Sequence, residues 1–244
     1  MTRSEALLKM DDLALSVLPI EDKISRLAIL AAVEGVKPAF MGDEEEYIEE
    51  YKEAGRRLGL NVLVTKRPPT DRYPRRKPHV PPSFVKAFHE MGEYGDKKTV
   101  WLYKDTRILD RISQSVAGQI NEGYALGYPE CCIRAYEEDR ITFLEATYNH
   151  IVDRYQAKNE QQAIRTLLTD PPVPPPKSPV LESFQKFPFI SHVACYSCLR
   201  GTSEESGKLN EILREIATQV GLNDRIIQSI TEFLQREKNR NRPS

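Results

Sequence analysis

The chain has 244 residues, of which 40% are hydrophobic and 29% are charged, and its 35 Lys and Arg nearly balance its 36 Asp and Glu. This composition provides a hydrophobic core under a charged surface, and the formal net charge of −1 excludes a globally basic nucleic-acid binder and an acidic tail protein. The longest apolar run, Leu27–Val33, is far shorter than the roughly 20 residues of a membrane-spanning helix. The N-terminal residues lack the apolar segment of a signal peptide. We therefore expect a soluble, cytoplasmic protein.

Residues 1–35 are predicted to form a unit of N-terminal helices. Leucines recur at helical spacing before Pro19, which ends the first helix. In the second helix, Ile24, Leu27 and Ala31 fall on one face. Both helices are amphipathic, so we expect each to pack against the rest of the protein.

Residues 36–125 alternate between strand and helix patterns. Short apolar segments at 36–41, 61–65 and 98–103 are typical of strands, and helical patterns at 43–58 and 105–122 follow the first and third of them. Strands that alternate with helices favour a parallel sheet with helices packed on its faces. The sequence predicts an α/β fold with a small parallel sheet of about three strands, followed by a helical part that contains the cysteines.

A basic, proline-rich loop is predicted at residues 66–82, between the second and third strands. Its prolines cannot complete the hydrogen bonds of a helix or sheet interior, so we expect an extended surface segment. Its basic side chains suit contacts with a phosphate backbone, which makes a nucleotide or an RNA a candidate partner. The residues for this contact are Lys66, Arg72, Arg75, Arg76 and Lys77. The alternative is a solvated connector without a partner.

A smaller anion site is predicted at the ends of the strands. In an open parallel sheet, ligands bind outside the carboxyl ends of the strands. Lys66, Arg67 and Lys104 follow the second and third strands, close to predicted helix N-termini that favour negative charge. No glycine-rich phosphate-binding motif occurs in the sequence. The three basic residues are therefore either a cofactor-binding site for a nucleotide-sized anion or solvated strand ends.

Residues 126–244 are predicted to be mainly helical. A helical region extends from Pro129 to about Leu168, and a proline-rich connector at 171–179 leads toward two amphipathic helices at the end of the chain. We expect the connector to bring the C-terminal segment back toward the first part of the chain. The two parts are then expected to form one compact unit.

The four cysteines of the chain occur as two close pairs, Cys131-Cys132 and Cys195-x-x-Cys198. They are too few for a secreted disulfide scaffold, and Cys-x-x-Cys is the usual half-site of a zinc knuckle and also of iron–sulfur centres. His192 precedes the second pair with the same spacing and is a further candidate ligand. The sequence therefore predicts a site for zinc or an iron–sulfur cluster, held by these cysteines with or without the histidine.

The first cysteine pair lies near a predicted helix start. Gly127 and Pro129 mark a turn into a helix, whose N-terminus stabilises thiolates. Adjacent helical residues point about 100° apart, so we do not expect the two thiols to serve one metal equally well. Either one of Cys131 and Cys132 is a ligand with its neighbour packed beside it, or both are ligands. Two other interpretations stay open, namely a metal-free dithiol redox site and ordinary core cysteines.

The segment Leu126-Gly-Tyr-Pro-Glu-Cys-Cys132, with His192-x-x-Cys195-x-x-Cys198 some sixty residues later, resembles the largely archaeal family called domain of unknown function 483. The resemblance covers roughly residues 20–215, and its specific part is these two motifs. Relatives have Pro and Ser around the second pair, where this chain reads Ala194-Cys-Tyr-Ser-Cys198. The resemblance implies a small α/β half and a functional cysteine site, and it carries no established activity.

Together these features predict a metal-binding protein that acts on a nucleotide or an RNA, with the reaction unassigned. The alternatives are a non-enzymatic, zinc-stapled binding module and a dithiol redox protein. Structural zinc is normally enclosed by four protein ligands, whereas catalytic zinc keeps one position open. The number of protein ligands therefore discriminates between the first two hypotheses.

Overall fold

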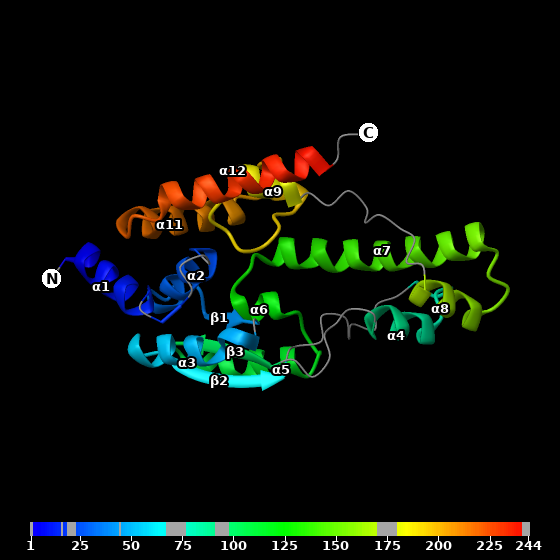
Figure 1. Ribbon diagram of the computed structural model, residues 1–244, viewed down its shortest axis with the longest axis horizontal. Helices are drawn as coiled ribbons and strands as arrows, with labels where there is room; N and C mark the ends of the chain where they lie inside the picture. The colour runs from blue at the N-terminus through cyan, green and yellow to red at the C-terminus, as the bar shows by residue number, and fades with distance from the viewer. Residues whose placement is uncertain are drawn as a thin grey trace.

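The computed structural model describes residues 2–15, 17–18, 23–43, 45–66, 77–90, 98–169 and 180–240. These residues form a mainly helical molecule around one small sheet (Figure 1). The strands are β1 (Ala39–Gly42), β2 (Asn61–Lys66) and β3 (Lys98–Tyr103). The helices are α1 (Arg3–Leu15), α2 (Lys23–Val33), α3 (Ile48–Arg57), α4 (Pro82–Glu90), α5 (Leu109–Val116), α6 (Glu122–Leu126), α7 (Glu130–Tyr155), α8 (Glu160–Thr169), α9 (Val180–Lys186), α10 (Tyr196–Leu199), α11 (Glu205–Gln219) and α12 (Asn223–Arg240), with short 3-10 turns η1 (Glu45–Tyr47) and η2 (Thr106–Ile108). No helix in these ranges combines the length and apolar character needed to cross a bilayer.

The sheet is antiparallel, so the predicted parallel sheet is wrong, although the α/β class is confirmed. The strand order is β1-β3-β2, and β3 pairs antiparallel with both neighbours. β1 and β2 run in the same direction, but β3 is inserted between them. Lys66 at the end of β2 pairs with Lys98 at the start of β3. The chain therefore leaves the sheet after β2 and returns to it at the same end, so β3 runs opposite to β2.

The two faces of the sheet are covered by different helices, because successive side chains of a strand point to opposite faces. Val100 and Leu102 of β3 pack in a cluster with residues of α2 and α3. Trp101 and Tyr103 pack in another cluster with residues of α5 and α6. The helix predicted for residues 105–122 is shorter in the structure, because the turn η2 precedes α5 and α5 ends already at Val116.

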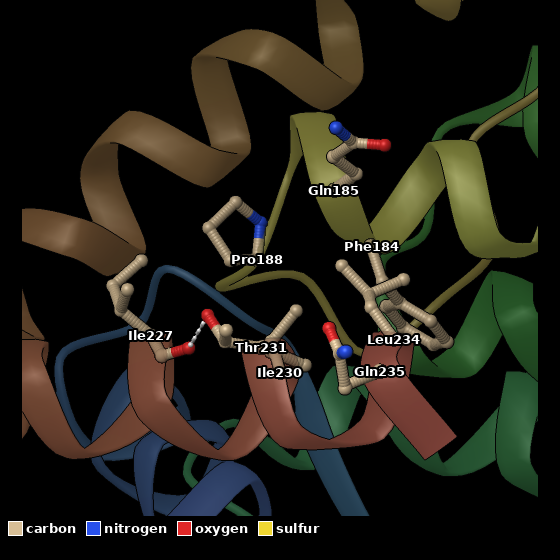
Figure 2. Close-up of a pocket in the computed structure, with 8 residues that line it drawn as sticks. All are labelled: Phe184, Gln185, Pro188, Ile227, Ile230, Thr231, Leu234 and Gln235. Atoms are coloured by element: carbon tan, nitrogen blue, oxygen red, sulfur yellow. Dashed lines mark hydrogen bonds between the residues drawn. The ribbon is translucent and has the colours of Figure 1, made fainter. Parts of the chain in front are cut away.

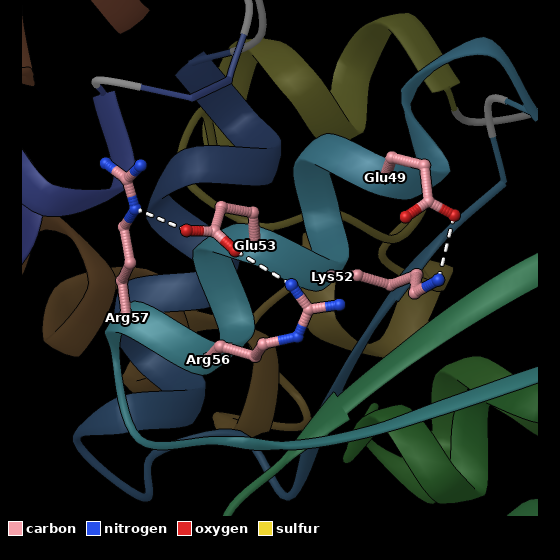
Figure 3. A network of polar contacts seen from close by, with 5 residues as sticks. All are labelled: Glu49, Lys52, Glu53, Arg56 and Arg57. Atoms are coloured by element: carbon pink, nitrogen blue, oxygen red, sulfur yellow. Dashed lines mark hydrogen bonds and ion pairs between the residues drawn. The ribbon is translucent and has the colours of Figure 1, made fainter.

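Helix α3 presents one face to the sheet and the other to solvent. Gly55 lies against the sheet so closely that a Cβ there would come within 2.7 Å of Leu102 and 2.9 Å of Val62. Ion pairs at helical spacing cover the exposed face (Figure 3). The members of this network are Glu49, Lys52, Glu53, Arg56 and Arg57. Such exposed pairs contribute little to stability, so burial against the sheet holds α3 in place.

The predicted N-terminal helices are α1 and α2, and a buried ion pair joins them. The guanidinium of Arg26 on α2 donates to both carboxylate oxygens of Asp11 on α1, and both side chains are almost completely buried. Residues 27–33 of α2 are all buried, because the helix lies between the sheet and α11. This position explains why α2 is apolar on most of its circumference.

Helix α7 connects the centre of the molecule to a separate hydrophobic cluster. It has 26 residues, which makes it about 39 Å long. Its C-terminal half packs with α4 and α8 in a cluster that includes Phe84, Leu144 and Ile151. Figure 1 shows α4 and α8 beside the end of α7 that is farther from the sheet. The helical region predicted from residue 129 to 168 consists of α7 and α8, and α7 ends at its C-cap Gln156, which has a positive φ of 50°.

The two amphipathic helices predicted at the C-terminus are α11 and α12. Ile216 of α11 and Ile226 of α12 belong to the same buried cluster. Between α12 and α9 lies a surface groove, with Phe184 on one side and Ile227 on the other (Figure 2). Ile227 of α12 is 41% exposed at this groove. The predicted connector at 171–179 lies outside the described residues.

Candidate metal centre

Cys131 and Cys132 lie in the first turn of α7, as the sequence predicts. Helix α6 ends at Gly127 in the left-handed conformation, and Pro129 immediately precedes α7. The carbonyl oxygen of Pro129 accepts hydrogen bonds from the backbone N–H groups of Cys132 and Ile133. The left-handed conformation favours glycine at position 127. Lack of space does so too, since a Cβ at this position would lie 2.4 Å from the ring of Pro38. The tight turn thus packs against Pro38, which precedes β1, and leads directly into the first turn of α7.

Cys195 and Cys198 lie on a compact turn around the short helix α10. Cys195 occupies the N-cap position, and its carbonyl oxygen accepts the N–H of Leu199. Gly201, with φ of 78°, donates its N–H to the carbonyl of Cys198 and turns the chain toward α11. The Cys-x-x-Cys spacing therefore places both thiols on the inner side of one turn.

The structure brings all four cysteines together. Their Sγ atoms lie within 4.8 Å of one another, and among the described residues these four form the group able to hold a metal ion. The Sγ of Cys198 is 3.7 Å from that of Cys131 and 3.8 Å from that of Cys132, while the last two are 3.9 Å apart. Both members of the adjacent pair therefore join the group, which is one of the two arrangements that the sequence left open. A cysteine-based metal site is compatible with this arrangement.

Hydrogen-bond donors surround the buried side of the cluster. The Sγ of Cys132 accepts the backbone N–H of Cys195 at 3.4 Å and lies 3.2 Å from the hydroxyl of Ser206. Ser206 also bonds to Cys198. Burial raises the pKa of Cys198, but hydrogen bonds from Ser206 and Ser203 outweigh burial and bring it down to about 7. Burial raises the pKa of Cys132 to about 11. Because a metal binds thiolates, we expect metal binding to this site to release protons.

His192, the fifth candidate ligand, lies behind the cluster and outside the converging group. Its Nε2 is 3.1 Å from the hydroxyl of Ser206, which in turn contacts Cys132. The imidazole ring packs on the ring of Tyr128 with centroids 4.8 Å apart. Burial, together with the charge of Lys37, lowers the pKa of His192 to about 4. The histidine is therefore a neutral group that supports a cysteine through Ser206.

The structure also contains a buried lysine that sequence reasoning missed. The ammonium of Lys37 donates to the hydroxyl of Ser191 at 2.9 Å and lies 4.8 Å from the ring centroid of Tyr128. Burial lowers the pKa of Lys37 to about 8 and raises that of Tyr128 to about 12. Lys37 stands in an apolar segment that was interpreted as a strand, whereas β1 begins only at Ala39. The sequence feature that could have pointed to this buried ammonium is the presence of a lysine within an apolar segment.

The residues of the predicted anion site do not come together. Lys66 ends β2 opposite Lys98, whereas Lys104 follows β3 at the other end of the sheet, where Asn61 donates to its carbonyl oxygen. Because the sheet is antiparallel, these two strand ends cannot form one rim. The ammonium of Lys104 donates to the carbonyl of Val33 at the end of α2. Arg67 lies outside the described residues, so the structural basis for this site is absent from the part of the sheet that is described.

Most of the predicted RNA contact also falls outside the described residues. This is the case for Arg72, Arg75 and Arg76, while Lys66 and the exposed Lys77 border that segment. Comparisons with protein-family models, with curated proteins and with solved structures found no match. The resemblance to the domain of unknown function 483 family therefore stays a prediction that rests on the two cysteine motifs.

Proposed function

We propose that the four cysteines hold a single zinc ion in a closed, tetrahedral site. The supporting observation is the spacing of the sulfurs, which all lie within 4.8 Å of one another, with three contacts of 3.7 to 3.9 Å. Four sulfurs placed tetrahedrally at about 2.3 Å from one zinc are separated by about 3.8 Å. In an iron–sulfur cluster the cysteines are shared among several irons, which spreads their sulfurs farther apart.

The site has four protein ligands and leaves no coordination position open, which favours a structural over a catalytic role. Zinc here joins the start of α7 to the turn around α10. Cys132 and Cys195 are 63 residues apart, so by analogy with a disulfide the link contributes about 4 kcal/mol through loop closure. We conclude that the protein is a non-enzymatic, zinc-stapled binding module rather than a metalloenzyme.

Metal analysis of the full chain, purified without oxygen, tests this proposal. We expect a colourless protein with one zinc per chain, and a cobalt-substituted form with the absorption of a tetrahedral thiolate site. Cys195→Ser is expected to lose the metal, whereas His192→Gln, which changes a residue outside the group, is expected to keep it. A brown protein with iron and acid-labile sulfide would contradict zinc. A metal-free protein with a reversible Cys195–Cys198 disulfide would instead indicate the dithiol redox alternative.

For the partner of this module we propose RNA, on the sequence of the basic segment alone. Six of the 14 residues from Lys66 to His79 are Lys or Arg, and such clusters bind phosphates in a salt-dependent manner. A filter-binding titration at several salt concentrations measures this. We expect affinity to fall steeply with salt and to weaken when Arg75 and Arg76 are changed to Ala. A flat salt dependence would eliminate RNA as the partner.

A further inference from the structure

The four sulfurs of the candidate metal centre differ in their access to solvent. Cys132, Cys195 and Cys198 are 6% exposed or less, whereas Cys131 is only half-buried. Of the four ligands, Cys131 is therefore the one that small molecules reach most readily without unfolding of the chain.

The surroundings of Cys131 also differ from those of its neighbours. The carboxylate of Glu205, at the exposed start of α11, lies 3.4 Å from the Sγ of Cys131. By contrast, the Sγ of Cys132 receives a backbone N–H and contacts the hydroxyl of Ser206. A hydrogen-bond donor stabilises the negative charge of a thiolate and makes the sulfur less nucleophilic. An ionised carboxylate has no hydrogen to donate, and its own negative charge lies close to the sulfur. The Sγ of Cys131 faces this carboxylate and one hydroxyl, that of Ser203 at 3.7 Å. When metal holds all four groups as thiolates, Cys131 is therefore a stronger nucleophile than Cys132.

A surface pocket adjoins this side of the centre. Cys198 and Ser203, which both contact Cys131, form part of its wall. Of the other lining residues, half are apolar or small and half are two basic and two acidic residues whose charges balance, namely Phe187, Gly201, Gly207 and Ile212, and Lys186, Lys208, Glu204 and Glu211. A Cβ at Gly201 would meet no atom within 4 Å, which shows how open this wall is. The pocket suits the carbon skeleton of a small, uncharged molecule.

We propose that Cys131 is a modification site, at which the metal-held thiolate accepts an alkyl group from a small, neutral carbon electrophile. The sulfur forms a bond to carbon, the bond from that carbon to its leaving group breaks, and the leaving group departs with the electron pair. No oxidant or base is needed, because the metal already holds the sulfur as a thiolate. This inference rests on the proposed metal site, and it adds a chemical reactivity to a centre that is otherwise a structural link.

The test treats the zinc-loaded full chain with less than one equivalent of iodoacetamide and locates the adduct by peptide mass spectrometry. We expect the first adduct on Cys131. Glu205→Gln is the matched variant, because it removes the carboxylate charge and offers an amide donor without changing a cysteine. It is expected to slow the reaction at Cys131 by roughly two- to fivefold, as is typical of one exposed charge, while zinc stoichiometry stays unchanged.

Metal content measured on the same samples separates the two proposals. If one zinc is bound and the first adduct lies on Cys132, Cys195 or Cys198, or is spread evenly over the four, the modification site is refuted and the metal site stands. An unchanged rate in Glu205→Gln would likewise refute the role given to the carboxylate. If the chain binds no metal, the proposed function fails, and the reactivity of a metal-held thiolate fails with it.

Discussion

The buried ammonium of Lys37 gives the sharpest prediction about stability. Its side chain donates to the hydroxyl of Ser191 and faces the ring of Tyr128, and among the ion pairs of the described residues none involves it. Burying a charge without an opposite charge is costly. Lys37→Met keeps a long, unbranched side chain in this space and removes the charge, so we expect the variant to be more stable than the wild type at neutral pH.

The expected magnitude follows from the shifted pKa of Lys37. Burial lowers this pKa from 10.5 to about 8, and at about 1.4 kcal/mol for each pH unit the difference corresponds to about 3 kcal/mol. Between these two values the unfolded chain binds more protons than the folded one, so folded-state stability rises with pH in this window. Below pH 8 the full cost is present, and above about pH 10.5 it disappears. The gain of Lys37→Met over the wild type is therefore expected to shrink across this window.

Urea denaturation of the metal-loaded wild type and of Lys37→Met at pH 7, 8, 9, 10 and 10.5 measures the difference. The other lysines and the cysteines titrate equally in both proteins, so their effects cancel. Lys158→Met is the matched control, since Lys158 is exposed and its removal is expected to change stability by less than about 0.5 kcal/mol at any of these pH values. If the difference between wild type and Lys37→Met is close to zero at pH 7, or does not change with pH, the reasoning is refuted.

Three further predictions concern other parts of the fold. Gly127→Ala places a Cβ against the ring of Pro38 at a left-handed position. We expect it to lower the free energy of unfolding, measured in urea, by about 1–2 kcal/mol more than Gly59→Ala, where φ is also positive but nothing lies within 4 Å. Asp11→Asn leaves the charge of buried Arg26 uncompensated, and we expect a loss of about 3–5 kcal/mol in the same assay, with an effect below 1 kcal/mol as the contrary result. The lowered pKa of His192 means that stability is retained above about pH 6.5 and falls as the pH drops toward 4; an NMR titration of the ring is expected to show a midpoint near 4, and a midpoint near 6.5 would contradict its burial as a neutral group.

Local sequence signals predicted the elements that carry the cysteines. The start of α7 follows from Gly127 and Pro129, because a left-handed cap and a residue without an N–H define a boundary within a few residues. The turn that holds Cys195 and Cys198 is likewise local, since their spacing alone places both thiols on one side of it. The same holds for the helical character of α2, α11 and α12, which follows from apolar residues at helical spacing.

The direction of β3 was not predictable from the alternation of strands and helices. That alternation indicates that β1 and β2 run in the same direction, which the structure bears out. It says nothing about where the chain re-enters the sheet after residue 66, and the pairing of Lys66 with Lys98 decides this. The predicted anion site required the ends of β2 and β3 to lie at the same edge of the sheet. Because β3 runs antiparallel to β2, Lys66 and Lys104 lie at opposite ends instead.

The sequence by itself determined that this chain has two thiol pairs, each presented by a local turn, within a mixed helix and strand fold. Only the tertiary structure decided that the pairs meet, because Cys132 and Cys195 come together across 63 residues of intervening chain. It also decided the burial of Lys37, whose partners Tyr128 and Ser191 come from distant segments. Spacing fixes geometry over one or two turns of chain, whereas the relative placement of turns depends on how the cores between them pack.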